Sequence, residues 1–173
     1  MPSCRIGRNV VLILLSAFLL GHALAQDTLA TTDPGTAPVP SLDYKNHCAQ
    51  EITKLILGGY DQWNARNLDA YLEIFWKSPD FMYSVDDEIV WGWAELKAEL
   101  LREYPDASTM GTVNSDRLEI RILTADLATI ANSWSMQFPK ARIIGTTTGT
   151  LCKFADGWRV ISAHTSTGEF PLR

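Results

Sequence analysis

The sequence has 173 residues, of which 46% are hydrophobic and 20% are charged, and its formal net charge at pH 7 is −5. This length is enough for one domain with a substantial core. The charges are spread along the chain without a basic stripe, so we do not expect binding to nucleic acid or to an anionic membrane surface.

The N-terminus has the three parts of a secretory signal peptide. Arg5 and Arg8 precede an apolar run over residues 10–20, and the tripeptide Ala-Leu-Ala at 23–25 supplies a cleavage site. The run is shorter than the ~20 residues of a membrane-spanning helix, although an uncleaved membrane anchor is the alternative. We predict that residues 1–25 are a signal peptide, and that the mature protein is periplasmic or secreted without a stable membrane association.

The next segments predict a leader followed by helices. Residues 26–41 are rich in Thr, Pro and Ala without an apolar period, which indicates a flexible leader before a domain over residues 42–173. A long first helix is expected from apolar residues at helical spacing, namely Ile52, Leu55, Ile56, Tyr60 and Trp63. Asn67 can cap a second, short helix over residues 68–76, which Pro79 ends.

Strands dominate the rest of the chain. DFMYSV and EIVWGW predict a hairpin around Asp86-Asp87, and a third helix is expected over residues 93–104. Four further strands are expected near residues 113–123, 127–137, 143–154 and 158–166. Helices that precede a run of antiparallel strands indicate an α+β fold, with the helices on one face of a curved sheet.

Four phrases in this order resemble the nuclear transport factor 2-like superfamily: NARNLDAYLEIFW, SPDFMYS, WGWAEL and KFADGWRVISAHTS. The resemblance covers about residues 45–168 and is closest to the exported SnoaL-like branch, with the ketosteroid-isomerase-like proteins as relatives. It implies a cone-shaped curved antiparallel sheet with three N-terminal helices packed on its concave face, as in cystatin-like folds. In this superfamily the sheet and helices enclose a cavity.

Aromatic residues on several elements are candidates for the lining of that cavity. Rings with one polar tip suit an apolar site that fixes a ligand through a few polar contacts, although each ring could instead only fill the core. We predict that a small apolar or aromatic molecule is bound by Trp63, Tyr83, Trp91, Trp134 and Thr148.

The resemblance also implies where steroid-isomerase residues would lie. That reaction uses a carboxylate base, with a tyrosine and a protonated aspartate that hold the dienolate oxygen. The aligned phrase places the tyrosine on Gly59 and the base on Val85, neither of which can serve. Tyr60 is one helical step of about 100° away and is expected to point elsewhere. Asp86 is expected to face away from Val85, unless a register shift brings Asp86 or Asp87 inward.

The last strand contains the stretch WRVISAHTS, residues 158–166. A period of two places on one face Trp158, Val160, Ser162 and His164. We therefore predict His164 as the candidate catalytic residue, acting as a general base near neutral pH or as a hydrogen-bond donor to a ligand. The alternative is structural, with His164 hydrogen-bonded to a neighbouring strand or to the first helix.

The sequence contains no sign of a cofactor or a metal. It has no glycine-rich phosphate loop and no nucleophile elbow, and His47 and His164 lack clustered partners. Cys48 and Cys152 form either a disulfide, as an oxidising compartment favours, or two free thiols.

Three functions remain open, and we rank them. The first is an exported module that binds a small molecule without catalysis. The second is an isomerase, dehydratase or cyclase with His164 as the base, assisted by Tyr83 or by an aspartate of the 86–87 pair. The third is a protein-interaction domain that forms a homodimer through an open sheet face, where apolar surface is expected from Ile120, Ile122 and Ile130.

Overall fold

The computed structural model describes residues 40–171, so the predicted signal peptide and most of the predicted leader lie outside the described residues. The helices are α1 (Leu42–Asn64), α2 (Leu68–Tyr71) and α3 (Trp93–Glu103), with short 3-10 turns η1 (Leu72–Ile74) and η2 (Ala107–Thr109). The strands are β1 (Met82–Val85), β2 (Glu88–Trp91), β3 (Thr112–Ile122), β4 (Leu127–Gln137), β5 (Ala141–Phe154) and β6 (Gly157–Pro171). This order confirms the predicted α+β fold.

The six strands form one open sheet in the order β2-β1-β6-β5-β4-β3. Strands β3 to β6 are antiparallel neighbours, but β1 pairs in parallel with β6, with Ser84 opposite His164. The expectation of a purely antiparallel sheet is therefore wrong at this pairing. The physical reason is that β1 and β6 are joined by a long crossover instead of a hairpin, so either direction can be used.

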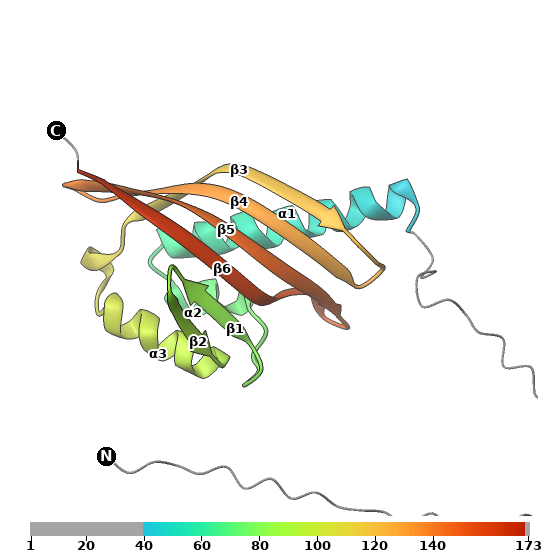
Figure 1. The fold of residues 1–173 in the computed structure, drawn as a ribbon, viewed down its shortest axis with the longest axis horizontal. Helices are drawn as coiled ribbons and strands as arrows, with labels where there is room; N and C mark the ends of the chain where they lie inside the picture. The colour runs from blue at the N-terminus through green and yellow to red at the C-terminus, as the bar shows by residue number, and fades with distance from the viewer. Residues whose placement is uncertain (1–39, 172–173) are drawn as a thin grey trace, which may run out of the picture. The chain divides into compact units, whose positions relative to one another are not determined.

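The three helices lie on the same side of the sheet (Figure 1). Helix α1 runs along the long strands, whereas α2 and α3 lie beside the β1–β2 hairpin. Ser41 caps α1 by accepting a hydrogen bond from the Tyr44 amide at 3.2 Å. The buried side of α1 recurs at helical spacing and comprises Cys48, Ile52, Ile56, Gly59 and Trp63. No helix among the described residues is long and apolar enough to cross a membrane.

The C-terminal end of α1 is fixed to the start of β3 by side-chain hydrogen bonds. The Asn64 amide donates to the Val113 carbonyl at 2.9 Å and accepts from the Val113 amide at 2.8 Å. The indole of Trp63 donates to the Gly111 carbonyl at 2.9 Å, and Arg66 donates to the same carbonyl at 2.7 Å. We call these contacts the α1–β3 clamp.

The second helix is shorter than predicted. Asn67 caps it by accepting from the Ala70 amide at 3.1 Å, but α2 ends at Tyr71 and only one 3-10 turn follows. Phe75 is already extended and forms a parallel bridge with Val160 of β6. Pairing with the sheet thus ends the helix before residue 76.

A β-bulge interrupts the pairing of β5 with β6. Thr150 pairs with Ser162, but the next residue, Leu151, pairs with Val160, which leaves Ile161 without an opposite partner. One extra residue on one strand shifts the alternation of side chains by one position.

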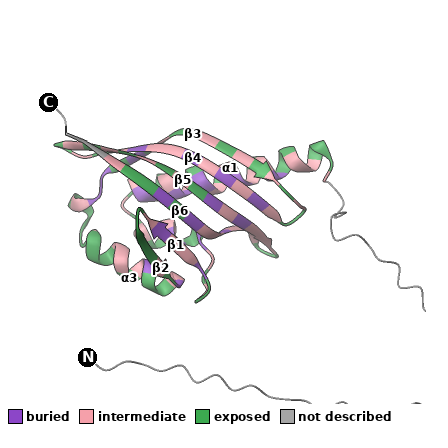
Figure 2. Cartoon of the chain, viewed as in Figure 1, coloured by how far each residue is buried: buried purple, intermediate pink, exposed green. Residues whose placement is uncertain are grey.

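The bulge reverses the predicted facing of the following residues. Trp158 and Val160 are buried in the core before it, and after it the buried positions are Ala163 and Thr165. His164 is exposed on the opposite face of the sheet, so the expectation that it shares a face with Val160 is wrong. Figure 2 shows the alternation of buried and exposed positions along these strands.

Two other expectations are resolved by the packing. Ile130 is buried in the core, and Ile120 and Ile122 pack against it, so these residues do not provide the open apolar surface expected for a dimer. Cys48 and Cys152 are free thiols, the former buried with its sulfur 3.9 Å from the Lys153 amine.

Two adjacent glycines of α1 allow a matched test of its packing. A Cβ at Gly58 meets no atom within 4 Å, whereas a Cβ at Gly59 would lie 2.9 Å from a methyl group of Ile74. We expect Gly58→Ala to raise the free energy of unfolding by about 0.5–1 kcal/mol, because alanine favours a helix. We expect Gly59→Ala to lower it by about 1 kcal/mol, because overpacking outweighs that gain. Urea denaturation measures both, and equal effects would contradict this packing.

Candidate functional site

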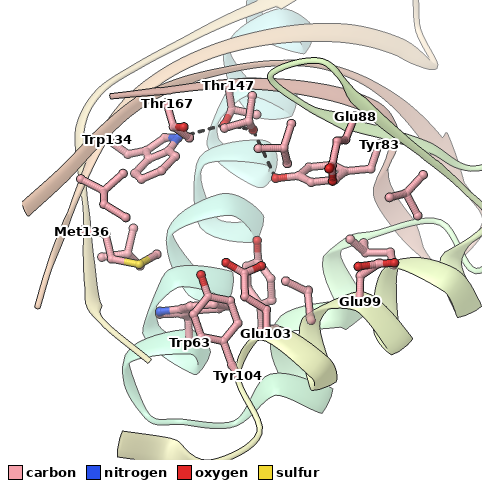
Figure 3. Close-up of a pocket in the computed structure, with 18 of the residues that line it drawn as sticks. Trp63, Tyr83, Glu88, Glu99, Glu103, Tyr104, Trp134, Met136, Thr147 and Thr167 are labelled. Carbon is pink, nitrogen blue, oxygen red and sulfur yellow. Dashed lines mark hydrogen bonds between the residues drawn. The ribbon is translucent and has the colours of Figure 1, made fainter. Parts of the chain in front are cut away.

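A cavity of about 600 Å³ lies between the helices and the inner face of the sheet (Figure 3). Six aromatic side chains line it, namely Tyr60, Trp63, Tyr71, Tyr83, Tyr104 and Trp134. Aliphatic side chains and Met136 complete the apolar part of the wall. Cavities of this size hold small organic ligands.

Three of the rings form a corner of the cavity. The ring of Trp63 lies 5.2 Å from that of Tyr71 at an interplanar angle of 74°, and 4.9 Å from that of Tyr104 at 85°. Such edge-to-face contacts are favourable and keep the rings nearly perpendicular to one another. The α1–β3 clamp also holds the Trp63 indole, the ring that contacts both of the others.

A chain of hydrogen bonds crosses the sheet side of the cavity. The Trp134 indole donates to the Thr147 hydroxyl at 2.9 Å, which lies 2.7 Å from the Thr165 hydroxyl. The Thr165 hydroxyl lies 3.2 Å from the phenol oxygen of Tyr83, where the chain ends (Figure 3). Gly145 is required beneath Trp134, because a Cβ there would lie 2.3 Å from the indole.

The tyrosine hydroxyls of the cavity are kept neutral. Burial raises the pKa of each of the four tyrosines Tyr60, Tyr71, Tyr83 and Tyr104. At neutral pH each phenol therefore carries its proton and can donate it in a hydrogen bond.

The placement of Tyr60 corrects an expectation from the sequence. Gly59 faces Ile74 of the neighbouring 3-10 turn, and Tyr60, one step further, lines the cavity. Its hydroxyl lies 2.7 Å from the side-chain amide of the buried Asn132, which also contacts Ser115 at 2.7 Å. A step of 100° still leaves Tyr60 on the half of α1 that faces the cavity.

Three glutamates line the cavity at its outer side, one on β2 and two on α3. Glu99 forms an ion pair with Arg102, which also lines the cavity. Glu88 and Glu103 form no salt bridge with any residue in the range 40–171. Across that same range, no group of three or more acidic, His or Cys side chains is placed to hold a metal ion.

The structure brings together three of the predicted ligand-binding residues and not the other two. Trp63, Tyr83 and Trp134 line the cavity. Trp91 is 62% exposed on the other face of β2, because it pairs with Met82 and not with Tyr83. Thr148 is also exposed, and the neighbouring Thr147 lines the cavity in its place.

His164 lies outside the cavity, on the exposed face of β6. Its Nδ1 atom is 2.8 Å from the Ser84 hydroxyl of β1, and its Nε2 atom is 3.1 Å from the Ser166 hydroxyl. The expectation that it faces the cavity is therefore wrong, because the bulge at Ile161 reverses the alternation. This geometry is the one expected for a hydrogen bond to a neighbouring strand.

The β1–β2 hairpin places Val85 in the cavity wall and Asp86 outside it. Val85 lines the cavity, as the aligned position of the isomerase base implies. Asp86 has a positive φ of 50° and accepts hydrogen bonds from the backbone amide and the hydroxyl of Thr167, both at 2.9 Å. These bonds lower the pKa of Asp86 and hold its carboxylate at the exposed hairpin turn.

Sequence reasoning missed the residues that α3 contributes. Glu99 and Glu103 are four residues apart, as are the cavity-lining Leu96 and Leu100, so helical spacing places both pairs on adjacent stripes. That spacing is a signal which could have indicated an acidic border on an apolar helix face.

No protein-family model matches the sequence, and no curated protein matches it. The structure is similar to that of an NTF-2 like protein of unknown function from Shewanella oneidensis MR-1, with a TM-score of 0.66 and 27% sequence identity. The match covers 68% of this chain and 98% of that chain. The domain has the nuclear transport factor 2-like fold.

Other structures with the nuclear transport factor 2-like fold match at lower identity. A hexachlorocyclohexane dehydrochlorinase, LinA-type3, from Novosphingobium barchaimii LL02 has a TM-score of 0.62 and 12% identity, over 76% of this chain and 94% of that chain. A scytalone dehydratase-like protein from Novosphingobium aromaticivorans DSM 12444 has a TM-score of 0.60 and 11% identity, over 77% and 94%. At these identities the similarity shows the fold alone.

Adjacent residues of β6 test which face lines the cavity. We expect Thr165→Val to lower the free energy of unfolding by about 1–2 kcal/mol, because it removes a buried hydroxyl that bridges Thr147 and Tyr83. We expect the matched change Ser166→Ala to stay within about 0.5 kcal/mol, because Ser166 is exposed. Chemical denaturation distinguishes the two, and the reverse order would contradict the facing set by the bulge.

Proposed function

We propose that this domain binds a small molecule with an apolar or aromatic body in the cavity between the helices and the sheet. The observation that carries the proposal is the set of six aromatic side chains around about 600 Å³, with one hydrogen-bonded chain in the wall. Aromatic walls supply contact area, and the few polar groups fix the orientation of a ligand.

Tyr83 is the group that we expect to orient the ligand. Its phenol stays protonated because burial raises its pKa, and Thr165 holds the hydroxyl at 3.2 Å. If the hydrogen bonds run from Trp134 through the two threonines, the phenol accepts from Thr165 and its own proton is free for a ligand oxygen. The indole can only donate, which favours this direction at the start of the chain.

An isomerase, dehydratase or cyclase activity is the second candidate. Two of the structures with this fold are described as a dehydrochlorinase and as scytalone dehydratase-like, and eliminations of this kind need a base beside the substrate. His164 lies outside the cavity, and Val85 occupies the aligned position of the isomerase base. A base for this chain would have to come from the carboxylates of Glu88, Glu99 or Glu103.

A neutral dye tests the binding site directly. N-phenyl-1-naphthylamine fluoresces more strongly in apolar surroundings, and we expect it to bind the protein saturably. Val85→Trp fills part of the cavity and should weaken this binding by about tenfold or more, because the ring occupies the ligand's space. The matched change Ile89→Trp, at an exposed position of β2, should leave binding unchanged. Equal binding by both variants would contradict the proposed site.

We also propose that the protein is exported, because residues 1–25 carry the features of a signal peptide. N-terminal sequencing of the protein from the periplasm or the medium should begin at Gln26. A product that retains Met1 in the membrane fraction would support the uncleaved anchor. The homodimer stays a prediction.

A further inference from the structure

The aromatic cavity has an excess of negative charge at its mouth. Three glutamates line it against one arginine, and that arginine is already paired with Glu99. Glu88 reaches it from β2 and Glu103 from the last turn of α3, and neither forms a salt bridge with a residue that the structure describes. Two carboxylates from separate elements thus line one cavity, and neither has a basic partner within residues 40–171.

One of these carboxylates, that of Glu103, lies near the aromatic corner of the cavity (Figure 3). Glu103 and Tyr104 are adjacent, and Figure 3 shows both pointing from the end of α3 towards the space that Tyr83 enters from the sheet. The rings of Trp63 and Tyr104 are nearly perpendicular, so they form two walls of a corner below that space. A ring presents its negative face to a cation, and tryptophan does so most strongly.

The negative charge of Glu103 affects the pKa of two tyrosines that line the cavity. Burial is the main cause of the raised pKa of Tyr104 and of Tyr83, and the negative charge of Glu103 adds to the increase in both. Because a carboxylate that disfavours a phenolate favours a cation at the same place, these directions agree with the geometry.

We propose that the cavity takes an organic cation, a substituted ammonium group on an apolar or aromatic body, with the charged head at Glu103 beside the Trp63–Tyr104 corner and with Glu88 adding negative charge to the same cavity. This inference rests on the proposed small-molecule binding. A neutral ligand of the same shape would gain from the aromatic rings alone. An anion would meet two unpaired negative charges. A cation gains from the rings and from the carboxylates together.

Three probes with one shared body test the sign of the charge. They are 4-hydroxyphenyltrimethylammonium, 4-tert-butylphenol and 4-hydroxybenzenesulfonate, of which the first two have nearly the same shape and the third is an anion. Each is titrated against the protein expressed from its full sequence, at low salt, by displacement of N-phenyl-1-naphthylamine. We expect the cation to displace the dye at about tenfold lower concentration than the neutral phenol, and the anion to be the weakest.

Variants identify the carboxylates responsible. Glu103→Gln and, separately, Glu88→Gln should reduce the advantage of the cation over 4-tert-butylphenol and leave the neutral phenol unaffected. Glu95→Gln is the matched control, because it removes an exposed charge of α3 that does not line the cavity. Since both test positions are exposed, loss of folding is not expected, and circular dichroism checks it.

The outcomes separate this inference from the function on which it rests. Binding of the neutral phenol as tight as that of the cation, or dye binding without displacement by the cation, would overturn the charge preference and leave the binding site standing. Failure of the dye and of all three probes to bind would overturn both. The control variant gives one more test. If Glu95→Gln reduces the advantage of the cation as much as Glu103→Gln does, the assignment of the charge preference to the carboxylates of the cavity is overturned.

Discussion

The α1–β3 clamp is the constraint on which the cavity depends. The Asn64 side chain binds both the amide and the carbonyl of Val113, as a neighbouring strand would, and so joins the helix to the edge of the sheet. Trp63 is held by the Gly111 carbonyl in the same region. These bonds hold the end of α1 against the start of β3, and the cavity lies beside them, with Trp63 and Val113 in its wall.

The interior of the domain therefore has two parts that differ in packing. Towards the start of α1, Cys48 and Ile52 are fully buried with Leu151 and give the domain its packed core. Towards the end of α1, aromatic side chains with polar tips surround a space instead of filling it. Tryptophan and tyrosine suit the second part, the lining of a space, since large rigid rings can meet at their edges and leave a gap between their faces.

The sequence predicted the elements well because their signals are local. The apolar spacing of α1, the Asn67 cap and the hairpin at Asp86-Asp87 each depend on a few neighbouring residues. The cavity was predicted only in part. Trp63, Tyr83 and Trp134 were found from residue type and alternation, but Trp91 was assigned to the wrong face.

The errors at the site have a common cause, which is that facing depends on pairing with distant strands. Tyr83 faces inward and Trp91 outward because of the register of their hairpin. His164 was expected inward because nothing in the sequence of β6 marks Ile161 as an extra residue; only the partner strand reveals it. A parallel partner for β1 is likewise decided by the whole fold and not by a local pattern.

The bulge at Ile161 also decides which side chains of β6 beyond it face the cavity and which face away from it. A straight β6 of the same sequence would slip by one residue beyond Val160. The cavity wall would then receive an imidazole between two serine hydroxyls, from His164, Ser162 and Ser166, instead of its threonines. Strand β6 thus carries threonine hydroxyls on its cavity face, and the imidazole of His164 with the hydroxyl of Ser166 on its other face. The bulge, and not the residue types of the strand, therefore decides which of these two sets of side chains lines the cavity.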